Sequence, residues 1–122
     1  MMKYVAVEGM DLVPVESGVE ISGVAVSTQA SSNVKADGKK VYSGDISVAI
    51  DSAVSGGYTA QGPIHFTIHP SAQYASADGK KMLLEGDTSN SVKVTGYMGQ
   101  SSKAFDVTIK VESAGQTSIK AE

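Results

Sequence analysis

Two copies of one short pattern restrict what this chain can fold into. The first copy begins with the pair Asp37-Gly38 and closes with Gly44-Asp45; the second begins with Asp78-Gly79 and closes with Gly86-Asp87. In each copy two lysines follow the first glycine, and the two Asp-Gly pairs lie 41 residues apart. Asp-Gly supplies the positive φ angles that a two-residue β-hairpin needs, so each copy predicts a tight hairpin with a second turn at its end.

With their flanks, the two copies form units of about residues 28–47 and 68–89. Two copies are fewer than a solenoid needs, so the pattern favours a closed fold. We therefore expect one all-β domain over residues 1–122, compact and built of short antiparallel strands and hairpins with an internal two-fold repeat.

Alternating apolar residues predict the strands outside the two units. Residues 46–50 and 63–70 each place three apolar side chains on one face, and residues 51–62 between them are predicted to form a loop. A C-terminal hairpin is expected over about residues 91–111, where Phe105, Val107, Ile109 and Val111 would share a buried face. No stretch has the apolar spacing of an amphipathic helix.

Composition excludes several functions for the 122-residue chain. There is no Cys, so disulfides and thiolate metal sites are absent, and all ten basic residues are Lys. With a net charge of −3 and no basic stripe, nucleic-acid binding is not expected. The start, Met1-Met2-Lys3-Tyr4, lacks a secretory signal, so we expect synthesis in the cytoplasm.

His65 and His69 are the only candidate metal ligands among the histidines. On a strand they share a face but lie about 13 Å apart at Cα, too far to bind one ion together. Two interpretations stay open. Either both belong to a solvated or intersubunit face, or the same His from three copies meets on an axis and binds zinc or iron.

The recurring carboxylates Asp37, Asp45, Asp78 and Asp87 each adjoin a glycine, where Asp hydrogen-bonds its own backbone at turns. An acid–base pair is the alternative interpretation. No nucleophile elbow or phosphate-binding loop accompanies them. The lysine pairs 39–40 and 80–81 are interpreted as solvated positions that protect a strand edge, or as contacts to an acidic partner. We therefore predict that the chain is not an enzyme and needs no cofactor.

The segment from Gly79 to Asp87 resembles the motif of the PAAR-repeat and PAAR-like proteins, the tips of contractile injection machines. It keeps the family's Gly-Lys start, its Gly-Asp end and the spacing between them, and the copy from Gly38 to Asp45 is one residue shorter. The Pro-Ala-Ala-Arg tetrad is missing from both copies, and without Cys the family's tip metal does not carry over.

The resemblance implies a structural role and a cone-like, pseudo-three-fold shape, which would need a third, diverged copy that the sequence does not locate. A PAAR-like protein would cap a VgrG-like trimeric spike in a type VI secretion system, a phage tail or an extracellular injection particle, and would assist puncture of a target membrane. Such a tip would be delivered or exposed as part of the particle, and it could hold an effector. The alternative function is a β-sandwich module for adhesion or carbohydrate binding, although the chain has no Trp to stack on sugars.

Overall fold

The computed structural model describes residues 2–122, and these residues form an all-β molecule. No helix occurs among them, as the sequence predicts, and consequently no helix is available to cross a membrane in that part of the chain. The strands are β1 (Lys3–Tyr4), β2 (Asp11–Pro14), β3 (Val19–Ser22), β4 (Ala25–Val26), β5 (Lys35–Ala36), β6 (Lys39–Lys40), β7 (Ile46–Ser55), β8 (Tyr58–Ile68), β9 (Ser76–Ala77), β10 (Lys80–Lys81), β11 (Val92–Met98), β12 (Ser101–Val107), β13 (Ile109–Ser113) and β14 (Lys120–Ala121).

One six-stranded antiparallel sheet carries most of the molecule. Its order is β12-β11-β8-β7-β3, and β4 also pairs with β7. The long β7–β8 hairpin turns at Gly56 and Gly57, both with positive φ, and the β11–β12 hairpin turns around Gly99. Four two-stranded sheets complete the fold: β1 with β14, β2 with β13, β5 with β6, and β9 with β10.

The predicted loop over residues 51–62 is wrong, because these residues belong almost entirely to β7 and β8. Small side chains explain the error: Ala53 and Ala60 face each other and are fully buried, which a search for large apolar residues overlooks. The register shifts between Ile50 and Ser52. At that irregularity Gly62 lies against the backbone of Ile50, where a Cβ atom would stand 2.4 Å from a carbonyl oxygen.

Apolar side chains gather in two separate clusters. The larger cluster contains residues of the long strands β7 and β8 and of β12 and β13, among them Ile46, Ile50, Phe66, Ile68 and Val107. The smaller cluster is formed by Val5, Val7, Ala36, Val41, Ala72, Ala77 and Leu84. Along β8 the buried residues 64, 66 and 68 alternate with more exposed ones, as the sequence predicts.

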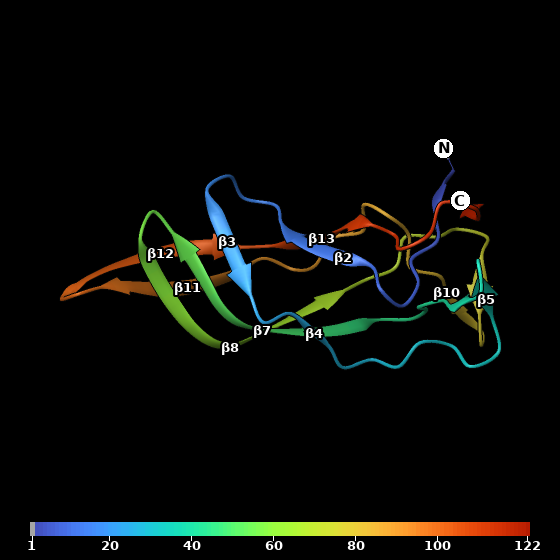
Figure 1. Cartoon of the computed structure of the whole chain (residues 1–122), viewed down its shortest axis with the longest axis horizontal. Coiled ribbons are helices and arrows are strands. Elements are labelled where there is room, and N and C mark those ends of the chain that lie inside the picture. Colours follow the sequence, from blue (N-terminus) through green and yellow to red (C-terminus); the bar gives the residue numbers. More distant parts are fainter. Residues whose placement is uncertain (1) are drawn as a thin grey trace.

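Figure 1 shows an elongated molecule with different structures at its two ends. The strands β5 and β10 lie at one end, together with the start and the end of the chain. The hairpins β7–β8 and β11–β12 extend from there toward the opposite end, and the turn of β11–β12 reaches farthest. We call the end that holds β5 and β10 the ring end, and the end that holds the β11–β12 turn the arm end.

Candidate functional site

The structure places both Asp-Gly pairs at two-residue hairpin turns. Asp37 and Asp78 each have φ of 55°, and the glycines that follow have φ of 77° and 76°. Two consecutive positive φ angles define the turn that matches the twist of a hairpin, and Gly at the second position accepts it without strain. The two turns join β5 to β6 and β9 to β10 with the same register.

Beyond these turns, three short segments meet in a closed ring of backbone hydrogen bonds. We call residues 5–7, 41–43 and 82–84 the ring. The amide of Ala6 donates to the carbonyl of Leu83 at 2.9 Å, Leu83 donates to Tyr42 at 2.9 Å, and Tyr42 donates back to Ala6 at 3.1 Å. The bridges Val7↔Val41, Ser43↔Met82 and Leu84↔Val5 join the last residue of each segment to the first residue of the next.

The same bonding recurs three times around the ring. On one side of it, three amides donate to three carbonyls in matching positions: Glu8 to Lys40, Gly44 to Lys81 and Glu85 to Tyr4. On the other side three more amides do so, each at 3.1 Å: Val41 to Val34, Met82 to Ala75 and Val5 to Ile119. Each ring segment is therefore preceded by an equivalent stretch of chain. Residues 31–40 precede the segment 41–43, and residues 72–81 precede the segment 82–84. For the segment 5–7, the equivalent stretch is residues 116–122 together with residues 2–4.

The two chain ends together thus occupy the position of a third unit. We call residues 31–45, residues 72–87, and residues 116–122 with 2–8 the three turn units. In the third, β14 pairs with β1 as β5 pairs with β6, and Ala121 stands opposite Lys3 as Ala36 stands opposite Lys39. Glu122 follows Ala121 in the position that Asp37 holds after Ala36.

A buried glutamine fastens this third unit. Gln116 is 6% exposed, and its amide group donates to the carbonyls of Val5 and Ile119 at 2.9 and 2.8 Å. Its side-chain oxygen accepts from the amides of Ser118 and Ile119. In the first unit the hydroxyl of Ser31 accepts in the same way from the backbone amides two and three residues further on, those of Asn33 and Val34. Each residue satisfies backbone groups that burial would otherwise leave unpaired.

The ring divides the two apolar clusters. The middle residues Ala6, Tyr42 and Leu83 belong to the larger cluster, beneath the hairpins. Four of their six neighbours, Val5, Val7, Val41 and Leu84, belong to the smaller one, and Met82 packs against it. This alternation follows from the two-residue period of extended backbone, and it buries every ring residue except Ser43 and Met82, which are partly buried.

The two Gly-Asp corners differ in their bonding. The Asp87 side chain is 5% exposed and accepts the amides of Leu84 at 2.8 Å and Ser71 at 3.1 Å, together with the Ser71 hydroxyl. Asp45 is exposed, and its carboxylate lies 2.9 Å from Nδ1 of His69. Only the second corner therefore has a buried carboxylate that fixes the backbone around it.

The candidate metal ligands are not brought together. His65 lies exposed in β8 opposite Ala49, and His69 follows the end of that strand beside Asp45. Within residues 2–122 no group of three or more His, Cys, Asp or Glu side chains is arranged to bind an ion. A histidine and one carboxylate make two of the four ligands that zinc takes, so a site here would need ligands from elsewhere.

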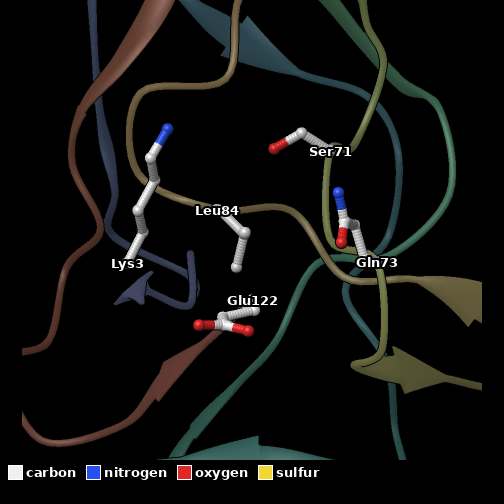
Figure 2. Close-up of a pocket in the computed structure, with 5 residues that line it drawn as sticks. All are labelled: Lys3, Ser71, Gln73, Leu84 and Glu122. Carbon is white, nitrogen blue, oxygen red and sulfur yellow. The ribbon is translucent and has the colours of Figure 1, made fainter. Parts of the chain in front are cut away.

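A shallow hollow of about 330 Å³ lies beside the third turn unit (Figure 2). It is lined by Lys3, Ser71, Gln73, Leu84 and Glu122. The hydroxyl of Ser71 donates to Asp87, so it is not held by an imidazole as a nucleophilic serine would be. The amide of Gln73 donates to the carbonyl of Glu122 at 2.9 Å. These bonds join the end of the chain to the second unit.

Two titratable groups of the turn units have shifted pKa values. Burial raises the pKa of Tyr42, and the negative charge of Glu8 raises it further. Asp78 has a lowered pKa. The main cause is the side-chain amide of Asn33, which donates to the Asp78 carboxylate at 3.0 Å, and Ser31 and Lys80 make smaller contributions. Both shifts arise from contacts within the ring end.

The sequence prediction overlooked the third turn unit, although a signal was present. Lys120-Ala121-Glu122 repeats the pattern of Lys35-Ala36-Asp37, and Lys3-Tyr4-Val5 repeats that of Lys39-Lys40-Val41. The two halves stand at opposite ends of the chain, so a search for a continuous third copy misses them.

The comparisons with known proteins add no assignment. The chain matches no family model, and no curated protein or solved structure is significantly similar to it.

Proposed function

We propose that the protein is a PAAR-like spike tip that caps a trimeric spike of a contractile injection machine and assists membrane puncture. The ring carries this proposal. Three segments with matching hydrogen bonds follow one another around a single centre. A single chain with such a pseudo-three-fold arrangement can face all three subunits of a trimer in similar ways, so one copy suffices to close a three-fold spike.

Three further segments suit the attachment. We call the segments between the turn units the arms. The first arm is residues 9–30, the second is residues 46–71 and the third is residues 88–115. Met98 of the third arm lies against Gly57 of the second, with its sulfur 3.2 Å from the position of a Cβ atom there, and the carboxylate of Glu16 in the first arm accepts the amide of Thr108 in the third. The arms thus brace one another, and we propose that the arm end contacts the spike.

A mechanical role is consistent with the packing. Most ring residues are buried, the larger cluster contains residues of all three arms, and no buried side-chain polar atom of residues 2–122 lacks a partner. Close packing resists deformation, which a tip under load requires. The role needs no reaction, so we propose that the protein is not an enzyme and reaches its target as part of a particle.

Capture by a trimeric β-helical spike tests the proposal. Native mass spectrometry should find one copy of the chain on each trimer. The exposed residues Tyr97 and Met98 near the β11–β12 turn should be required, so Tyr97→Asp with Met98→Asp should abolish capture. Tyr74→Asp at the ring end serves as the control and should leave capture unchanged. Failure to bind spike trimers, with binding on a glycan array instead, would favour the carbohydrate-binding alternative.

A further inference from the structure

Lysine is concentrated at the ring end. Seven of the ten lysines lie in the turn units, and all seven are exposed: Lys3, Lys35, Lys39, Lys40, Lys80, Lys81 and Lys120. Lys3, Lys39 and Lys80 hold matching positions opposite Ala121, Ala36 and Ala77 in the three small hairpins. Exposed lysine side chains are therefore supplied by all three turn units around the centre of the ring.

Packing keeps these three lysines close to the ring. Cδ of Lys80 lies 2.8 Å from the position of a Cβ atom on Gly44, and Nζ of Lys3 lies 3.6 Å from that on Gly86. Nζ of Lys39 donates to the carbonyl of Gly115 at 2.9 Å. Each lysine thus reaches a glycine outside its own hairpin, and its aliphatic stem can cover backbone there while the ammonium group stays near solvent.

The arms carry the opposite charge. They contain three lysines against six carboxylates, a formal charge of −3, whereas the turn units contain seven of each and are neutral. Among the unit carboxylates, Asp87 is buried, Asp78 accepts from Asn33 and Asp45 lies beside His69. An anionic surface would therefore repel the arm end and turn the ring end toward itself.

The turn units that carry these lysines also carry exposed apolar side chains. Tyr74 is 80% exposed and Ile119 is 46% exposed, and both belong to turn units. Tyrosine favours the boundary between water and lipid, where its ring is apolar and its hydroxyl is wet. Lysines flanking such residues are typical of surfaces that bind anionic lipid.

From this arrangement we infer that the ring end binds an anionic phospholipid surface directly, with Lys40 and Lys81 supplying attraction and Tyr74 entering the headgroup layer. The inference rests on the proposed function for its biological role, because a spike tip would present this end to the target membrane. It assigns to the lysines a contact with lipid headgroups in addition to the protection of strand edges.

Sedimentation of the purified chain with vesicles tests the inference. Phosphatidylglycerol vesicles should retain the chain, phosphatidylcholine vesicles should not, and added salt should weaken the retention by screening. Lys40→Gln with Lys81→Gln should lower the affinity about 25-fold, since each lysine near an anionic bilayer contributes about fivefold. Tyr74→Ser should lower it by a smaller factor.

Matched variants on the arms are the controls. Lys93→Gln with Lys103→Gln removes the same charge, and Tyr97→Ser removes an exposed tyrosine, so both should bind as the unchanged chain does. Circular dichroism should show that every variant is folded. Equal loss from variants at both ends, or equal retention on the two kinds of vesicle, would overturn the inference. A chain that caps a trimer but ignores vesicles contradicts this inference alone, whereas one that binds vesicles but no trimer contradicts the proposed function alone.

Discussion

The arms and the ring end are both made of β-strands, but they are held together differently. In the arms, the longest strands form local hairpins, β7 with β8 and β11 with β12, whereas the shorter strands β2, β3 and β4 pair with distant partners. In the ring, each segment bonds two others that lie tens of residues away. Pairing two strands across a short turn costs little loop-closure entropy, whereas forming the ring costs more because three distant parts of the chain must meet. The ring therefore depends on specific buried contacts, which substitutions can remove one at a time.

The largest effect should come from the apolar side of the ring. Leu83 is fully buried and packs into the larger cluster, so Leu83→Ala should lower the free energy of unfolding by about 3 kcal/mol. Urea denaturation monitored by circular dichroism measures this. Tyr97→Ala in the exposed part of β11 is the comparison and should change stability by less than about 0.5 kcal/mol. Similar losses from the two variants would mean that the ring is no more critical than the arm surface.

The two Gly-Asp corners provide a second comparison. Asp87→Ala leaves the amides of Leu84 and Ser71 without their acceptor and should cost about 3 kcal/mol. Asp45→Ala removes only an exposed contact with His69 and should cost less than about 0.5 kcal/mol. Thermal unfolding of the two variants side by side decides the matter. If Asp45→Ala proves the more harmful, the assignment of roles to the two corners is wrong.

The Asp-Gly hairpins should respond alike to substitution. Gly38→Ala and Gly79→Ala each force alanine into a left-handed conformation with φ near 77° and 76°, and each should cost about 1 kcal/mol. No neighbouring atom lies within 4 Å of the added methyl group in either case, so conformation alone sets the cost. Chemical denaturation of both variants checks that the values agree. A difference above about 1 kcal/mol would show that the two turns are not equivalent.

The smallest effect concerns the charge on Asp78. Its pKa in the folded chain lies below the ordinary value of 3.8, so its contribution to stability is present above that pH and is lost as the pH falls through the lowered pKa. Asn33→Ala removes the side-chain amide that donates to the Asp78 carboxylate, so it should raise the pKa of Asp78 toward the ordinary value. An NMR titration of the Asp78 carboxyl measures the shift, and no change on substitution would exclude Asn33 as its main cause.

The features that the sequence predicted correctly are those that depend on residues close together in the sequence. The Asp-Gly turns, the alternating faces of residues 46–50 and 63–70 and the absence of helix all depend on local spacing, and all occur within residues 2–122. The C-terminal hairpin is shorter than predicted, because it ends at Val107, and Ile109 and Val111 lie in the separate strand β13, which pairs with β2. The middle of the β7–β8 hairpin was missed because its core residues, Ala53 and Ala60, are small. The ring was missed because closure depends on Gln116 and on the pairing of the two chain ends, which no local pattern records.

The place of Gln116 in the chain has a consequence for biosynthesis. Its side chain bonds the carbonyl of Val5, a residue made more than one hundred positions earlier. The ribosome therefore delivers the early strand long before the glutamine that holds it, and until then the edge of the first segment is open to pairing with other chains. A nascent chain of this design would gain from holding that edge apart, and the lysines along the small hairpins provide such a charge barrier.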